Sequence, residues 1–252
     1  MFRYFRLQLK LAILALYESL AGRAARPAPV PSPRLRHRVH GSTDIVGYLE
    51  VGERSWRSIE SLLETTGRRS KDAKRMLDFG CGSGRTIQNI DPKGHDRVMG
   101  VDIDQTAIRW CQSNLPGYQF KHVDPDPPTS LPDGYFDLIY AISVFTHLDE
   151  EMQFSWLSEI ERLLAPNGIF VASLHGDYHR ALKGRNIDME QGYRFVDSKR
   201  KWFKPDGLPE FYQDAQHTKT YVFERWSQYF RIVDYVERGI ADYHDAVILA
   251  KS

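Results

Sequence analysis

The sequence lacks three features that would place the protein in a special class. Its 252 residues include only two cysteines, Cys81 and Cys111. Two cysteines cannot build a disulfide framework, and their spacing matches no metal-binding pattern, so we predict a reducing compartment and no metal ligands. The net charge of +1 gives no indication that the protein binds a polyanion such as a nucleic acid. The apolar run Leu11–Tyr17 is far shorter than the ~20 residues that span a bilayer.

What remains is an ordinary globular composition, with 42% hydrophobic and 27% charged residues. The length fits one domain with an appendage, or two small domains. The charge is unevenly spread, because residues 1–44 hold eight basic and two acidic residues, a net +6, while the remainder is −5. We therefore predict a basic head over residues 1–40 and a catalytic domain over residues 41–252.

The head begins with an amphipathic segment, residues 2–20. One side at helical spacing carries Phe2, Phe5, Leu9, Ala12, Ile13, Leu16 and Leu20, and the other carries Arg3, Arg6 and Lys10. Three interpretations stay open: a helix lying on anionic lipid, a helix packing on the body or on a second copy in a homodimer, and a secretory signal, which Tyr17 and Glu18 disfavour. Residues 26–38 contain four prolines and predict an extended linker.

The body alternates strands and helices. The predicted strands are Arg75–Phe79, Arg97–Val101, Gln119–Val123, Phe136–Ile142 and Ile169–Leu174; the predicted helices are Val51–Thr65, one through Thr86 and Ile90, Thr106–Ser113 and Glu151–Leu164. This order predicts an α/β fold with an open, mostly parallel sheet and helices on both faces. Ligands of such sheets bind beyond the carboxyl ends of the strands.

After Leu174 the alternation stops. Residues 175–217 are rich in turn and aromatic residues and predict an inserted hairpin or substrate lid. A helix, Thr218–Tyr229, and two strands, Phe230–Glu237 and Ala246–Ala250, complete the chain. The link between these strands is too short for a helical crossover, so they should pair antiparallel.

The segment from Asp78 to Arg85, DFGCGSGR, stands between the first strand and the next helix. Glycines at alternate positions let the backbone approach a ligand closely. The pattern departs from the dinucleotide motif G-x-G-x-x-G, because Arg85 holds the place of the last glycine. Asp78 would repel a pyrophosphate but can bind an ammonium group. The turn thus predicts a ligand with a cationic amine, the alternative being a turn with incidental glycines.

Two aspartates follow the next two strands. Asp102 lies 18 residues after Gly84, near the spacing of about twenty for an acid that accepts from a ribose diol; the alternative is a helix cap. Ile103 is placed to pack on an adenine face. Asp124 could accept from an adenine amino group or serve as a turn residue in the run DPDPP.

Together, LDFGCGSGR, VDID, FDLIYAISVFTHL and LLAPNGIFVAS resemble the motif series of class I, Rossmann-like S-adenosylmethionine-dependent methyltransferases of the small-molecule type. The resemblance covers about residues 51–174, and YHDAVILAK matches the last strand. It implies a seven-stranded sheet of order 3-2-1-4-5-7-6 with the last strand antiparallel, and S-adenosyl-L-methionine as cofactor. It also implies that Asp78, Gly80 and Gly82 line the methionine part, Gly84 starts a helix, Asp102 takes the ribose hydroxyls, Ile103 and Asp124 meet adenine, and Ile142 and Ser143 border the sulfonium.

Transfer to a hydroxyl is accelerated by a base that removes the acceptor's proton, and histidine titrates in the right range. The candidates are His147, His175 and His217, each with a structural alternative as a cap or a hydrogen-bonded packing residue. The insertion adds aromatic side chains that could cover an acceptor or form the lid's own core, namely Tyr193, Phe195, Trp202, Phe203, Phe211 and Tyr212.

Nucleic-acid acceptors are disfavoured, because the position after the fourth strand reads ISVFTH and carries neither an Asn/Asp-Pro-Pro-aromatic run nor a cysteine. Our first hypothesis is a cytoplasmic enzyme that methylates a small molecule, on an oxygen of a sugar, a glycolipid precursor or a secondary metabolite. The second is a methyltransferase of a lipid-linked acceptor, held at the inner membrane face through residues 2–20. The third is a non-catalytic scaffold that keeps the fold.

Overall fold

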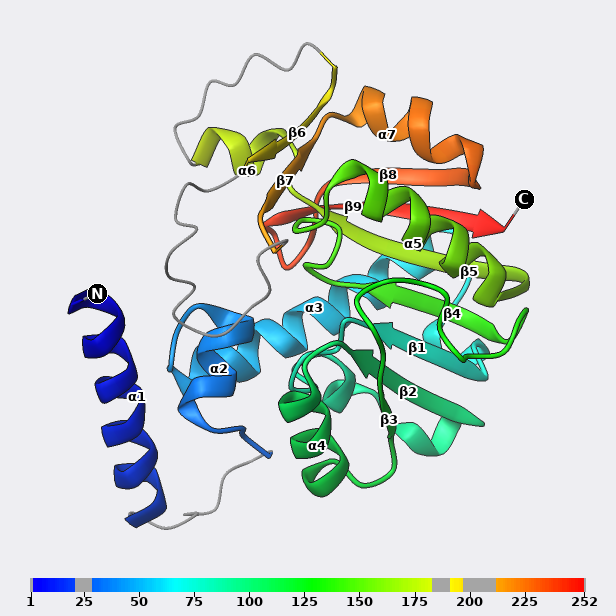
Figure 1. Cartoon of the computed structure of the whole chain (residues 1–252). Coiled ribbons are helices and arrows are strands. Elements are labelled where there is room, and N and C mark those ends of the chain that lie inside the picture. Colours follow the sequence, from blue (N-terminus) through cyan, green and yellow to red (C-terminus); the bar gives the residue numbers. More distant parts are fainter. Residues whose placement is uncertain (1, 21–28, 183–190, 197–211, 252) are drawn as a thin grey trace.

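The computed structural model describes residues 2–20, 29–182, 191–196 and 212–251, and its centre is one mixed sheet (Figure 1). The strands lie in the order β3-β2-β1-β4-β5-β9-β8. Their bounds are Gln119–His122 (β3), Arg97–Asp102 (β2), Arg75–Phe79 (β1), Phe136–Ala141 (β4), Leu164–Leu174 (β5), His244–Lys251 (β9) and Phe230–Ile240 (β8). β9 runs antiparallel to both neighbours, whereas β3 to β5 are parallel. The predicted order is confirmed, since β8 and β9 are the sixth and seventh strands of this sheet.

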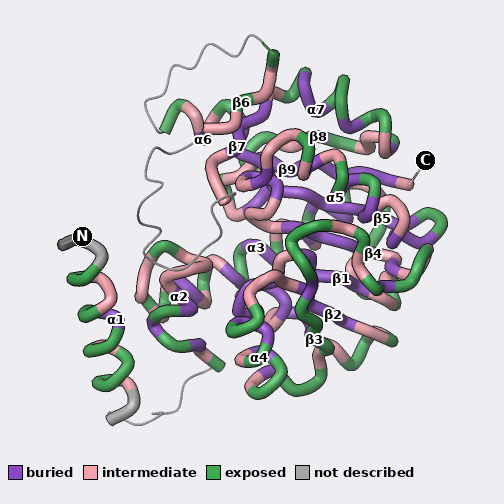
Figure 2. Tube along the Cα trace, in the orientation of Figure 1, coloured by how far each residue is buried: buried purple, intermediate pink, exposed green. Residues whose placement is uncertain are grey.

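Both faces of the sheet are covered by helices, as the apolar strands predict. Alternate residues of one strand enter opposite cores, so Met76 packs in one cluster and Leu77 in the other. Helices α3 (Ile45–Thr65) and α4 (Gln105–Asn114) cover one face, and α5 (Glu150–Leu163) with α7 (Lys219–Arg225) covers the other. The inner strands β1, β2, β4, β5 and β9 are buried along most of their length, whereas the edge strands β3 and β8 are partly exposed (Figure 2).

The helix predicted through Thr86 and Ile90 is wrong. Residues after the glycine turn form turns and a short 3₁₀ segment, η2 (Ile87–Asn89). The Asn89 side-chain amide donates to the carbonyl oxygens of Arg85 and Thr86, at 3.0 and 3.1 Å. These carbonyls would accept from later amides in an α-helix, so the side chain ends the segment early. Gly84 therefore does not start an α-helix.

The predicted linker also contains a helix, α2 (Pro33–His40). Ser32 caps its first turn, Pro33 occupies a first-turn position and Gly41 ends it in the left-handed region. The prediction of an extended linker was wrong for residues 33–38, because the prolines that suggested it include one at a helix start. The helix contacts α3 and lies beside the carboxyl edge of the sheet.

Helix α1 (Phe2–Leu20) stands to one side of the body in Figure 1. Leu11 is buried and Glu18 pairs with Arg36 of α2, but Phe5, Leu9 and Leu16 are more than half exposed. The face that carries these exposed side chains therefore does not pack on the body of the same chain, although Leu11 and Glu18 hold α1 against α2. Packing of this face on a second copy, or on lipid, stays a prediction. No described helix is both long enough and apolar enough to cross a membrane.

The insertion after β5 contains a short helix and a hairpin where it is described. These are α6 (Asp177–Leu182) and the antiparallel pair β6 (Tyr193–Val196) and β7 (Asp214–His217). The insertion thus contains an antiparallel strand pair, as the hairpin alternative predicts, and its role as a substrate lid stays a prediction. Trp202, Phe203, Phe211 and much of the predicted lid lie outside the described residues.

Candidate active site

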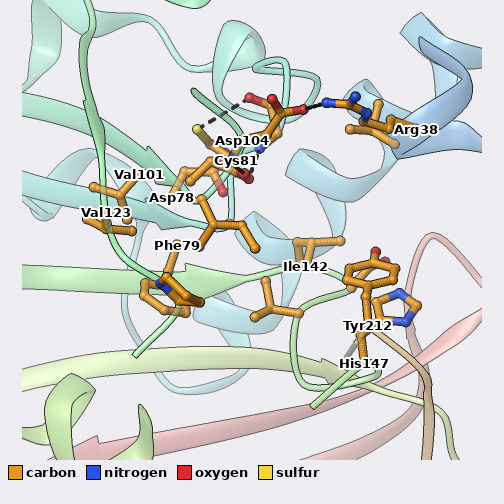
Figure 3. A pocket seen from close by; sticks show the side chains of 18 of the residues that line it. Arg38, Asp78, Phe79, Cys81, Val101, Asp104, Val123, Ile142, His147 and Tyr212 are labelled. Atoms are coloured by element: carbon orange, nitrogen blue, oxygen red, sulfur yellow. Dashed lines mark hydrogen bonds and ion pairs between the residues drawn. The ribbon is translucent and has the colours of Figure 1, made fainter. Parts of the chain in front are cut away.

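A cavity of about 290 Å³ opens where β1, β2 and β4 end (Figure 3). Seven of the nine predicted cofactor residues line it, and one side of it is apolar. The lining includes Asp78, Phe79, Gly80, Gly82, Arg85, Val101, Asp102, Ile103, Val123, Ile142, Ser143, His147, Trp156 and Tyr212. The position agrees with the rule that ligands of open α/β sheets bind at the carboxyl ends of strands.

The glycine turn forms the floor of this cavity with its backbone. Gly80 has φ +77°, and a Cβ there would lie 2.3 Å from Val144 Cγ2. Gly82 has φ +53°, and its Cβ would lie 2.6 Å from Val39 of α2. Neither position can hold a side chain without displacing a neighbour, so the backbone itself faces the cavity.

Asp78 is an unusual carboxylate for the end of a buried strand. It is 3% exposed, and its Oδ2 has no hydrogen-bond partner among the residues that the structure describes. Burial raises its pKa to about 8 against the Tyr140 hydroxyl and the Ile87 amide, which lower it as donors to this carboxyl, and the nearby Asp102 carboxylate acts in the same direction as burial. An ammonium group of a ligand would supply the Oδ2 atom with both a hydrogen and a positive charge.

Asp102 is held in place by the turn it faces. Its Oδ2 accepts from the Gly82 amide and its Oδ1 from the Asp104 amide, each at 2.7 Å. Each carboxylate oxygen has about two acceptor sites, so Asp102 keeps capacity for two further donors such as a ribose diol. Burial raises its pKa, against these two backbone bonds. Asp104 caps α4, so the alternative cap role falls to Asp104 and not to Asp102.

Of the five other predicted cofactor residues, three line the cavity and two do not. Ile103, Ile142 and Ser143 line it. Asp124 is exposed and outside the lining, although its neighbours Val123 and Pro125 are part of it. Gly84 is also outside, since it packs against the core, where its Cβ would lie 2.4 Å from Leu115.

Of the three candidate bases, His147 alone lines the cavity. Its Nδ1 lies 2.6 Å from the carbonyl oxygen of Gln213. A carbonyl only accepts, so Nδ1 carries the hydrogen and the neutral ring keeps its lone pair on Nε2. The ring also stacks on Tyr212, with centroids 3.8 Å apart (Figure 3). The insertion therefore fixes both the tautomer and the plane of this histidine.

His217 lies in the core, away from the cavity. It is fully buried, and its Nε2 donates to Gln153 Oε1 at 2.9 Å, while the Gln153 amide donates to two backbone carbonyls. Burial lowers its pKa to about 3, so the ring is neutral near pH 7. These contacts are those of a structural histidine.

His175 is buried beside the cavity without lining it. Its Nδ1 lies 2.7 Å from Asp214 Oδ1, and its ring centroid is 6.1 Å from that of His147.

The residues that α2 contributes to the cavity were not predicted from the sequence. Arg38 and Val39 of α2 line it, and Arg38 pairs with Asp104. The cap Ser32, the following Pro33 and the terminal Gly41 were readable helix boundaries. Arg85 was read only as a missing glycine, yet its guanidinium side chain lines the cavity, and burial lowers its pKa.

The donor set fits a nucleoside linked to an amino acid. An apolar wall is available for a base, Asp102 for a diol and Asp78 for an ammonium, with a cationic Arg85 on the same lining. No cluster of basic side chains for a pyrophosphate lines the described cavity.

Comparisons with known proteins agree with this geometry. Residues 77–172 match the family model described as "Methyltransferase domain". The chain is 31% identical over 98 residues to a "Probable S-adenosylmethionine-dependent methyltransferase" of Mycolicibacterium smegmatis, covering 39% of this chain and 37% of that protein. It is 30% identical to the malonyl-[acyl-carrier protein] O-methyltransferase of Geobacter sulfurreducens, covering 57% of this chain and 54% of the relative. The chain thus spans about half or less of these relatives.

Among solved structures, the 1,6-didemethyltoxoflavin-N1-methyltransferase of Burkholderia thailandensis, which was crystallised with S-adenosylhomocysteine, has a TM-score of 0.55. The match is 20% identical and covers 91% of this chain and 94% of the other. At that identity the likeness concerns the fold.

Proposed function

Because this chain carries a domain of the class I S-adenosylmethionine-dependent methyltransferases, we propose that the whole protein transfers a methyl group to an oxygen of a small-molecule acceptor. The observation that carries the proposal is the pairing of a buried, donorless Asp78 oxygen with Asp102 across one glycine turn. S-adenosylmethionine supplies the methyl group on its sulfonium, so the protein's task is to bind, orient and exclude water.

The chain's residues divide that task by charge. Asp78 binds the ammonium of the methionine part and Arg85 its carboxylate, which places opposite charges on opposite ends of a zwitterion. Asp102 accepts from the ribose hydroxyls. Ile103 and Trp156 belong to the apolar wall for adenine. Ile142 and Ser143, after β4, border the sulfonium and leave the methyl facing the His147 side of the cavity.

His147 is the base that removes the acceptor's proton. Gln213 holds the tautomer with the lone pair on Nε2, and Tyr212 holds the ring plane. A positioned base of this kind contributes about 10²–10⁴-fold to rate. Small-molecule acceptors are supported by two relatives whose names specify such substrates, the Burkholderia enzyme above and an ajmaline N-methyltransferase of Rauvolfia serpentina.

Two measurements test this function. Calorimetry with S-adenosylhomocysteine should give one site in the wild type and at least tenfold weaker binding in Asp102→Ala. Transfer of radiolabelled methyl from the cofactor into a metabolite extract should label a small-molecule fraction. Binding without any labelled product would favour a scaffold, and no binding at all would overturn the proposal.

A second candidate is supported by helix α1. Its exposed apolar side chains, among them Phe5, Leu9, Ile13 and Leu16, adjoin the exposed basic residues Arg6 and Lys10. Apolar side chains beside basic ones fit an anionic membrane surface. We propose on this ground that the acceptor of the same reaction is lipid-linked and reached at a membrane.

A further inference from the structure

Three histidines and one aspartate that are far apart in sequence meet beside the active-site cavity. His175 follows β5, His179 lies in α6, Asp214 begins β7 and His244 begins β9. The rings of His175 and His179 are stacked with centroids 3.6 Å apart, and the ring of His244 is 4.9 Å from that of His175. His175 and His179 are 7% and 3% exposed. Packing of the core does not require several imidazole side chains in contact with one another, so their grouping suggests another role.

The donor atoms of this cluster converge. One ligand atom each from His175, His179 and Asp214 lies within 4.8 Å of the other two. The Asp214 carboxylate is oriented from both sides, since Oδ1 meets His175 and Oδ2 accepts from the Gln216 amide at 3.2 Å. A hydrogen bond that orients a carboxylate in this way is typical of residues around a metal ligand.

We propose that His175, His179 and Asp214 bind a divalent first-row transition cation, with His244 next to it. Two imidazoles and one carboxylate suit Zn²⁺, Fe²⁺ or Co²⁺ and are poor ligands for Mg²⁺ or Ca²⁺. Ligand atoms of a tetrahedral zinc site are about 3.4 Å apart, given bonds of about 2.0–2.1 Å. The donor atoms lie within 4.8 Å of one another, so binding would require the stacked rings of His175 and His179 to turn.

The location gives the cation a role in the proposed methyl transfer, on which this last step rests. His147, which lines the cofactor cavity, is next to His175. His244 lines a second cavity of about 340 Å³ that shares Arg85, Ile142 and Ser143 with the first. A cation held by His175, His179 and Asp214 would bind an oxygen of the acceptor and lower the pKa of the acceptor's hydroxyl group.

The test uses untagged full-length protein, treated with a chelator and dialysed. Titration with Zn²⁺ should show one site per chain by calorimetry, and Co²⁺ should give visible absorption bands. His179→Ala and Asp214→Asn should each weaken Zn²⁺ binding at least tenfold. His95→Gln is the matched control, because His95 is bound to the Ala73 carbonyl far from the cluster and its loss should leave binding unchanged.

Two results would overturn the metal site: no Zn²⁺ or Co²⁺ binding by the wild type at 100 times the protein concentration, or equal binding by the wild type and both variants. Circular dichroism of the variants separates lost binding from lost folding. S-adenosylhomocysteine binding is measured in parallel, so a protein that binds the nucleoside but no metal refutes this inference and leaves the methyltransferase function intact.

Discussion

Asp78 is the residue at which stability and ligand binding conflict. Its carboxyl is buried with an unmatched oxygen, and its pKa is raised to about 8 from an unfolded value of 3.8. Between these pH values the folded chain binds more protons than the unfolded chain, so the stability of the ligand-free protein falls as the pH rises through this window. A bound ammonium reverses the penalty by pairing with the ionised form.

Asp78→Asn should therefore separate the two properties. The ligand-free variant should melt several degrees above the wild type at pH 8, and this gain should largely vanish toward pH 4, where the Asp78 carboxyl of the folded wild type is protonated and neutral. S-adenosylhomocysteine should bind at least tenfold more weakly to the variant at pH 8. Differential scanning fluorimetry and calorimetry across the pH range measure both. A melting difference independent of pH would show that Asp78 is not buried as a titrating group.

Gly80 combines a left-handed backbone with a close contact. Gly80→Ala should cost about 1–2 kcal/mol for the conformation alone, and more because its Cβ would meet Val144. Gly67→Ala is the matched control, since Gly67 has φ +74° with nothing within 4 Å. Urea unfolding should rank Gly80→Ala below Gly67→Ala, and cofactor binding should fall only in the former. Equal losses in the two variants would mean that the turn has room for a side chain.

His147 is the residue whose loss should affect turnover without affecting cofactor binding. His147→Gln removes the basic nitrogen but keeps a polar side chain near Tyr212. We expect kcat to fall about 10²–10⁴-fold, with S-adenosylhomocysteine affinity within about twofold of the wild type. If turnover survives, the proton leaves by another route and His147 only packs against the insertion.

At the scale of elements, α2 forms part of the cavity wall although it precedes the sheet. Arg38 joins it to Asp104 at the start of α4. Arg38→Ala should loosen this wall and weaken cofactor binding severalfold, as measured by calorimetry. Arg34 lies on the exposed side of the same helix, so Arg34→Ala should bind like the wild type. Equal affinities for all three proteins would place α2 outside the binding site.

The elements that the sequence predicted well are those with local causes. The run Phe136–Ile142 is apolar without alternation because β4 is buried on both faces, and the structure places it at the centre of the sheet. The glycine turn is also recognisable from a local sequence pattern. It lies beside Asp102 because β1 and β2 are neighbouring parallel strands that end at the same edge of the sheet. A helix was predicted after this turn, but the Asn89 side chain ends the segment early by donating to the preceding carbonyl oxygens. Such hydrogen bonds leave no periodic pattern in the sequence.

Contacts between distant segments were beyond prediction. His175 and His244 are brought together because β9 returns antiparallel to β5, and Asp214 joins them through the β6–β7 hairpin. In the sequence His244 reads as a residue in a late turn. Their grouping is a property of sheet topology, and spacing along the chain contains no trace of it.

At the scale of the whole molecule, a basic and partly apolar helix stands beside a mildly acidic body. If α1 binds to an anionic membrane surface, the double substitution Leu9→Glu and Ile13→Glu should abolish flotation of the protein with vesicles that contain anionic lipid. Both side chains are more than half exposed, so the fold should be unaffected; Gln8→Glu, on the same helix, is the control. Wild-type protein that fails to float, and sediments as a dimer instead, would assign this face to a second copy.

Helix α2 has two attachments. Arg36 is fully buried, pairs with Glu18 of α1 and bonds the carbonyls of Pro31 and Thr43. Two and three residues further on, Arg38 and Val39 reach the nucleoside cavity. The eight-residue helix α2 therefore connects α1 to the opening of the nucleoside cavity. A displacement of α1 would also move Arg38 and Val39, which line that cavity.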